Sequence, residues 1–305
     1  MAFLEAQHIV KKYANHLALD DVNISIPENS IFGLLGPNGA GKTTFIRIIN
    51  QITGPDEGTI FFNGQPLQSK HIAQIGYLPE ERGLYKKMKV GEQALYLAQL
   101  KGMSRLDALK KLKYWFEKFE ISAWWDKKVE ELSKGMQQKI QFIVTILHQP
   151  SLLILDEPFS GFDPINTKQI KEEILHLKKE GATIIFSTHN MGSVEELCDH
   201  ITLINKGKSI LSGEVAEIRR EYRDNPALLE YSNASTPIES LLPPQYIVHE
   251  RSQTNGYSML RIDMPKDASL NELIQLVSSH CQIHSCSEIL PGMDEVFIRV
   301  VDQNR

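Results

Sequence analysis

The segment Gly36-Pro37-Asn38-Gly39-Ala40-Gly41-Lys42-Thr43 decides the fold of this chain. Its spacing fits the pattern G-x-x-x-x-G-K-[ST], with an apolar run before it and a helix-like segment, 43–50, after it. Glycines let backbone N–H groups curl around phosphate oxygens, the lysine adds a positive charge, and the threonine hydroxyl can ligate Mg²⁺. A helix that begins there also presents its free amides to an anion. We therefore predict a nucleotide-phosphate site, with Thr44 as a further binding residue.

Two acidic residues and a histidine follow two other apolar runs. Asp156 and Glu157 come directly after Leu152–Leu155, which is typical of a buried parallel strand, and His189 follows the run 183–188. Side chains at the ends of parallel strands point into the crevice where ligands bind. We expect Asp156 to hold Mg²⁺, Glu157 to accept a hydrogen bond from the attacking water, and His189 to contact the γ-phosphate.

The order of strand and helix patterns predicts an α/β fold with a mostly parallel sheet and helices packed on it. Residues 1–215 form the first predicted domain, interrupted at about 86–135 by a helical insert. The rhythm changes near 215–226, and residues 227–305 read as a small α+β domain. The insert is recognised by apolar residues at three- and four-residue spacing: Leu106, Leu109, Leu112, Phe116 and Phe119.

Composition excludes several classes of protein. The 305 residues carry a net charge of −5, so a nucleic-acid partner is not expected. Three cysteines are too few for a disulfide framework and indicate a reducing compartment. We see no secretory signal at the start and no apolar run near the ~20 residues of a membrane helix. If the protein works at a membrane, we expect it to do so through a partner.

The segment Leu132-Ser133-Lys134-Gly135-Met136-Gln137-Gln138-Lys139 resembles the LSGGQ signature of the ATPase subunits of ABC transporters. The resemblance covers roughly residues 1–215. Ser133 and Gly135 match the signature, whereas Lys134 and Met136 depart from its commonest form. The resemblance implies that these four residues, at the start of a helix, contact the γ-phosphate bound by a second subunit.

Further positions match the same family. Tyr13 corresponds to the aromatic residue that stacks on adenine, and Asp163 to the D-loop that crosses the dimer interface. Glu80 stands where the family commonly has glutamine, and the resemblance implies that it contacts Mg²⁺ or water. The run from Gly76 to Tyr85, together with the extra C-terminal domain, resembles ATP-binding subunits of ABC-2-type exporters for sodium or drugs.

The resemblance implies a P-loop NTPase fold that hydrolyses ATP with Mg²⁺ and powers an exporter. It implies two partners, a membrane-spanning permease and a second ATPase subunit, identical or different, at the cytoplasmic face of the cell membrane. The alternative that we keep is a soluble ABC-type ATPase that is not engaged in transport. A six-span membrane protein in the neighbouring reading frame would favour transport.

Four possible metal ligands lie close together in the C-terminal domain: His280, Cys281, His284 and Cys286. If 282–289 is a strand, alternation places Cys281 on the face opposite to His284 and Cys286. We therefore expect ordinary packing of these side chains and no zinc site.

Overall fold

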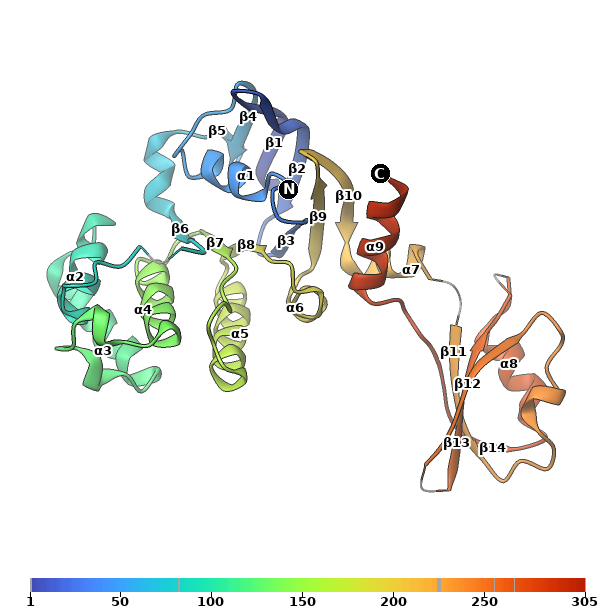
Figure 1. Ribbon diagram of the computed structural model, residues 1–305. Helices are drawn as coiled ribbons and strands as arrows, with labels where there is room; N and C mark the ends of the chain where they lie inside the picture. The colour runs from blue at the N-terminus through green and yellow to red at the C-terminus, as the bar shows by residue number, and fades with distance from the viewer. Residues whose placement is uncertain (1, 82, 224–225, 255, 266, 305) are drawn as a thin grey trace. The chain divides into compact units, whose positions relative to one another are not determined.

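The computed structural model of the chain describes residues 2–81, 83–223, 226–254, 256–265 and 267–304 (Figure 1). The chain divides into two compact units, residues 1–215 with 300–305, and residues 216–299. No helix within these described ranges combines the length and the apolar composition that are needed to cross a membrane.

The larger unit is built on a six-stranded sheet with the strand order β10-β9-β3-β8-β7-β6. All neighbours in it pair in parallel except β10, which is antiparallel to β9. The strands β3, β7 and β8 are buried at every position, as their continuous apolar runs predict, so the predicted mostly parallel sheet is confirmed. The strand bounds are β3 (Ile31–Leu35), β6 (Ile75–Leu78), β7 (Leu152–Asp156), β8 (Thr183–Ser187), β9 (His200–Asn205) and β10 (Lys208–Glu214).

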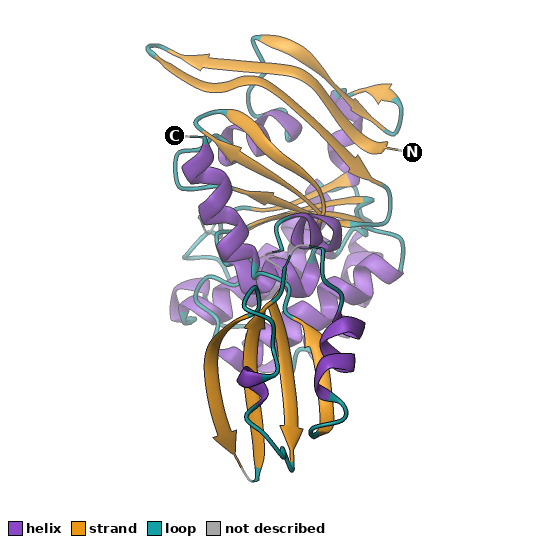
Figure 2. Ribbon diagram, turned by 90° about the vertical axis from the view of Figure 1, so that its right-hand side faces the viewer, coloured by secondary structure: helices purple, strands orange, loops and turns teal. Residues whose placement is uncertain are grey.

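A second sheet of this unit is antiparallel, with the order β2-β1-β4-β5. Helix α1 lies between the two sheets, because its Phe45 and Ile46 are fully buried in a core that contains residues of both (Figure 2). The phosphate loop that precedes α1 is therefore held from both sides. The bounds are β1 (Ala2–Tyr13), β2 (His16–Pro27), α1 (Lys42–Ile49), β4 (Glu57–Phe62), β5 (Gln65–Pro66) and the 3₁₀ helix η1 (Ser69–Gln74).

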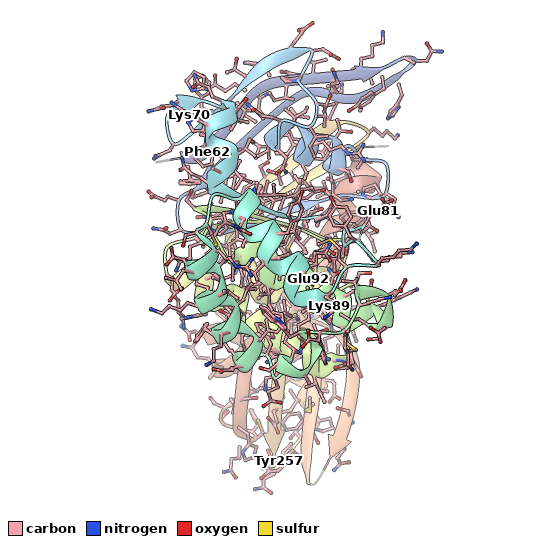
Figure 3. The ribbon with its side chains drawn as sticks, turned by 90° about the vertical axis from the view of Figure 1, so that its left-hand side faces the viewer. Phe62, Lys70, Glu81, Lys89, Glu92 and Tyr257 are labelled. Carbon is pink, nitrogen blue, oxygen red and sulfur yellow. The ribbon has the colours of Figure 1, made fainter. Side chains whose placement is uncertain are left out.

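The helical insert contains α2, α3 and the beginning of α4. Buried positions on α3 repeat every four residues, at Ala108, Leu112 and Phe116. Leu106 is not in this series and is 78% exposed, so its assignment to the apolar stripe was wrong. Figure 3 shows Glu81 on the segment leading from β6 to α2, and Lys89 and Glu92 where α2 begins. The bounds are α2 (Val90–Leu100), α3 (Arg105–Lys118), η2 (Ser122–Trp124), η3 (Val129–Glu131) and α4 (Lys134–Ile146).

The remaining helices of the larger unit follow strands of its six-stranded sheet. Asp163 caps α5, since its Oδ1 accepts hydrogen bonds from the backbone N–H groups of Ile165 and Asn166 at 3.0 and 2.9 Å. Pro164 occupies the first position of that helix, where no amide hydrogen is needed. The bounds are α5 (Pro164–Lys179) and α6 (Met191–Leu197), and α7 (Val215–Glu221) begins at residue 215 of this unit and continues into residues of the second unit.

The second unit is an antiparallel sheet with the order β12-β13-β11-β14. Helix α8 packs on it, and Leu273 and Val277 of the helix share a core with Leu229, Tyr231 and Leu260 of the sheet. The segment 294–300, which reads as either helix or strand, is helical. The bounds are β11 (Pro226–Ser232), η4 (Ile238–Ser240), β12 (Ile247–Thr254), β13 (Tyr257–Asp263), α8 (Leu270–Val277) and β14 (Gln282–Glu288). Helix α9 (Met293–Gln303) begins in this unit, and its residues from 300 onward are grouped with the first.

A bulge in β14 changes the faces predicted for its side chains. The pairing with β11 shifts by one residue between Ser285 and Ile283, so alternation is broken at His284. His284 lies close to Ser232, with 2.8 Å between its Nε2 and the serine Oγ, whereas Cys286 packs against the core. The prediction that His284 and Cys286 share a face was therefore wrong.

The first turn of α2 packs directly on an indole ring. A Cβ at Gly91 would lie 2.3 Å from Cε2 of Trp125. We expect Gly91→Ala to lower the free energy of unfolding by about 1–3 kcal/mol, because the ring must move. Urea denaturation checks this, with Gly54→Ala as the control, since no atom lies within 4 Å of a Cβ there. Equal stability of the two variants would contradict this packing.

Candidate functional site

Three loops meet at one edge of the six-stranded sheet. The glycine-rich loop follows β3, the acidic pair ends β7, and His189 follows β8, which lies between the other two strands. Because the three strands are parallel, their carboxyl ends meet there. The loops enclose a cavity of about 250 Å³. Its lining residues are Tyr13, His16, Ala18, Asn38, Gly39, Ala40, Gly41, Lys42, Thr43, Thr44, Glu80, Asp156, Glu157 and His189.

The backbone of the loop requires glycine at two points. Gly36 has φ 145°, and a Cβ there would lie 2.1 Å from the carbonyl oxygen of Ile204. Gly41 has φ 118°, and its Cβ would lie 2.5 Å from the carbonyl oxygen of Ala18. A side chain at either position would push the loop away from the neighbouring strands, so glycine keeps the loop curled against them.

Lys42 is the positive charge at the centre of this loop. Its side chain is buried, and its Nζ donates hydrogen bonds to the carbonyl oxygens of Gly36 at 2.6 Å and Pro37 at 3.1 Å. Burial lowers the pKa of Lys42, and the negative charges of Glu157 and Asp156 act in the opposite direction. A phosphate group in the loop would supply the acceptors that these two carbonyls now provide.

Asp156 lies at the floor of the cavity and is 4% exposed. Burial raises the pKa of Asp156, the nearby hydroxyl of Ser187 lowers it, and the charges of Glu80 and Glu157 raise it further. A cation bound between these carboxylates would reduce the electrostatic repulsion between them. The hydroxyl of Thr43, also in the cavity wall, adds a neutral oxygen.

Glu157 is held by the end of β8. Its backbone is left-handed, with φ 47°, which is unusual outside glycine and aims the side chain at β8. Oε2 accepts a hydrogen bond from the hydroxyl of Thr188 at 3.1 Å. Oε1 accepts one from the backbone N–H of His189 at 3.0 Å and lies 2.6 Å from its ring Nδ1. The carboxylate and the imidazole therefore form one unit.

The residues that resemble the signature lie outside this cavity. Ser133 caps α4, since its Oγ accepts a hydrogen bond from the backbone N–H of Met136 at 3.3 Å. A Cβ at Gly135 would lie 2.9 Å from the carbonyl oxygen of Gly161. The helix start is thus packed against the segment that follows Glu157. Residues 133–136 and Asp163 are absent from the described lining of the cavity.

Three residues of the site were not predicted from the sequence: Thr188, His16 and Ala18. Thr188 donates a hydrogen bond to Glu157. The sequence feature that could have identified it is a hydroxyl residue at the end of a predicted strand, next to His189. His16 lines the cavity, and it pairs with Tyr13 across the β1–β2 hairpin. His16 could be identified only from the pairing register of this hairpin, and the sequence pattern does not specify that register.

The donor set fits a magnesium nucleotide. Mg²⁺ prefers oxygen ligands, and the cavity offers the Thr43 hydroxyl and the carboxylates of Asp156 and Glu80. The loop at the amino end of α1 supplies the amides and the lysine that phosphate oxygens require.

Comparisons with known proteins agree with this geometry. Residues 19–160 match the family described as ABC transporter, and residues 213–301 match the family described as ATP-binding protein DrrA1-3-like, C-terminal domain. The chain is 51% identical over 219 residues to the ABC transporter ATP-binding protein YhaQ of Bacillus subtilis, covering 72% of this chain and 74% of that one. It is 29% identical over 261 residues to Nod factor export ATP-binding protein I of Cupriavidus metallidurans, covering 85% of each. A solved ATP-binding subunit of an ABC transporter aligns with 72% of this chain and 93% of its own, with TM-score 0.67 and 31% identity.

Replacing Lys42 by methionine tests the loop. We expect Lys42→Met to weaken ATP binding about tenfold to a hundredfold, because hydrogen bonds to charged groups are lost. The measurement is titration calorimetry. Lys101→Met is the control, since Lys101 also donates to two backbone carbonyls, those of Ile72 and Ile75, but lies outside this cavity. Unchanged ATP affinity in Lys42→Met would refute the assignment.

Proposed function

The chain belongs to the family of ABC transporter ATP-binding proteins, and we propose that it drives an exporter as one of two ATPase subunits docked on a membrane-spanning permease. As a member of this family it binds and hydrolyses ATP to power transport. The observation that carries the proposal is the single cavity that joins Lys42 to the Asp156–Glu157 pair and His189. A relative named for Nod factor export, matched over 85% of both chains, supports export as the direction.

The phosphates of ATP are held by the loop. Lys42 exchanges its two carbonyl acceptors for oxygens of the β- and γ-phosphates, while the loop amides surround the β-phosphate. Tyr13, at the end of β1, lines the same cavity and is 41% exposed, so its ring is available for stacking on adenine. These contacts place the γ-phosphate toward Glu157 and His189.

Glu157 positions water and accepts its proton. The carboxylate keeps one hydrogen bond from Thr188, and the contact with His189 fixes its direction. The ring of His189 then lies beside the γ-phosphate, where it can donate a hydrogen bond. Thr43, Asp156 and Glu80 would hold Mg²⁺, which when bound neutralises charge on the phosphates.

We propose two subunits because the residues that resemble the signature do not line the cavity of their own chain. Ser133, Lys134, Gly135 and Met136 form an anion-attracting helix start, but they lie away from the cavity of their own chain. A second copy, or a related subunit, would bring its signature to the γ-phosphate, with Asp163 near the interface. ATP would then bridge the two subunits.

Glu157→Gln tests this arrangement. The variant keeps the shape of the side chain but loses its basicity, so we expect hydrolysis to fall by a factor of about 10² to 10⁴. Bound ATP would persist and would shift the protein from monomer to dimer, because it binds both subunits. Size-exclusion chromatography with light scattering, with and without Mg-ATP, measures the shift.

Glu172→Gln is the matched control, since Glu172 is an exposed residue of α5 that is absent from the cavity lining. It should hydrolyse ATP and elute like the unmodified protein. Wild-type hydrolysis in Glu157→Gln would show that Glu157 is not the base. An inactive Glu157→Gln that stays monomeric with ATP bound, even with the permease present, would contradict the shared site.

A second cavity, of about 620 Å³, is the site where we place the permease. It lies between the helical insert and the phosphate-binding core, and it is lined by α2, α4, η1 and the segment after β6. Its described lining has many apolar side chains, one lysine, Lys101, and no carboxylate. Burial lowers the pKa of His148, which is also in this lining, to about 4, so its ring is uncharged at neutral pH. Such a groove suits a helix of the permease at the cytoplasmic face of the membrane. Glu80 links this segment to the nucleotide cavity.

Photocrosslinking tests the docking site. A photoreactive amino acid in place of Leu100, which is 64% exposed in this groove, should crosslink to the permease in membranes. The same substitution at Tyr257, an exposed residue of the second unit, serves as the control. Crosslinks from Tyr257 and none from Leu100 would contradict the proposal.

A further inference from the structure

One polar side chain in the nucleotide cavity is still without a role. His16 begins β2 and is paired in register with Tyr13, the last residue of β1. Residues directly opposite in an antiparallel pair project to the same side of the hairpin. Both line the cavity, and so does Ala18, two residues further along β2. Alternate residues of this strand therefore form one wall of the nucleotide cavity.

Ala18 and Tyr13, on either side of His16, define its position along that wall. The carbonyl oxygen of Ala18 touches the phosphate loop, as its approach to Gly41 shows. His16 lies about 6.6 Å further along the strand, toward the hairpin tip. Tyr13, opposite it, is the residue available for the base. In a nucleotide, the ribose and the α-phosphate connect the base to the β-phosphate, so His16 stands beside that connecting part.

The hairpin that carries His16 is fixed by one carboxylate. Asp56 accepts hydrogen bonds from the Nζ of Lys11 and from the backbone N–H of Lys12, both at 2.7 Å. The same ammonium group lies 5.5 Å from the centre of the Tyr13 ring, a cation–π contact. The end of β1 is thus positioned before any nucleotide binds, and β2 follows through its pairing with β1.

Acidic and non-acidic residues lie on different sides of the described cavity lining. Its carboxylates come from the ends of β6 and β7, on the side of the γ-phosphate and the metal. The β1–β2 wall contributes no acidic residue to the described lining. Within the described residues, the ring of His16 has no hydrogen-bond or ion-pair partner. An imidazole N–H that is free, and separated from the carboxylates, is suited to a phosphate oxygen.

We propose that His16 donates a hydrogen bond to the α-phosphate of bound ATP, an inference that rests on the proposed function of the cavity. His16 is then a binding residue that recognises the nucleotide between its base and its terminal phosphates. Lys42 and the loop hold the β- and γ-phosphates, so the two contacts are independent.

Ligands that contain different parts of ATP test the proposal. We expect His16→Ala to weaken ATP and AMP about tenfold, to leave adenosine unchanged, and to leave inorganic pyrophosphate unchanged. Displacement of a fluorescent ATP analogue measures all four ligands. Asn15→Ala is the matched control, because Asn15 lies at the same hairpin tip but is absent from the cavity lining. His16→Gln, which keeps a donor, should recover part of the loss.

Each other result has a defined meaning. An equal loss for adenosine and AMP would place His16 on the base or the ribose and overturn the proposal. Unchanged AMP affinity in His16→Ala would also overturn it, as would a loss for pyrophosphate. If the unmodified chain bound neither ATP nor pyrophosphate, the proposed function itself would fail, which distinguishes that outcome from the loss of this one contact.

Discussion

The parallel pairing of β8 with both β3 and β7 is the constraint on which the nucleotide site depends. Parallel strands align their carboxyl ends, so a loop after β3 and a carboxylate after β7 are brought together, although more than one hundred residues separate them. The groups that hold the carboxylate of Glu157 also belong to this strand's end, since Thr188 and His189 follow β8 directly. Loss of this register would separate the phosphate loop from Glu157.

Sequence alone predicted the parts of the site that are local. The phosphate loop, its flanking strand and helix, and the acidic pair after a buried strand are each contained within a few residues, and spacing specifies them. Features that depend on pairing between distant segments were not predicted. One of these is the pairing of β1 with β4 in a separate antiparallel sheet. The place of His16 opposite Tyr13 depends on a nearby pairing, the register of the β1–β2 hairpin, which was not predicted either.

Local irregularities were missed for a related reason. The bulge at His284 moves one side chain across a strand, and nothing in the alternation of polar and apolar residues records it. Leu106 has the right spacing for the apolar stripe of α3, but it lies in the first turn, and Ala108 takes the buried position instead. Periodicity gives the repeat of a helix, whereas the face that is buried depends on what packs against it.

The three carboxylates of the nucleotide cavity also have a consequence for the form in which ATP enters. In the described lining, Glu80, Asp156 and Glu157 lie in the same cavity as Lys42, so their negative charges oppose the attraction of the loop for a free polyphosphate anion. The glutamate at position 80 adds one charge more than the glutamine that is common there. A cation that accompanies the nucleotide would reduce this repulsion. Because Asp156 is 4% exposed, salt screens its charge less than that of an exposed carboxylate.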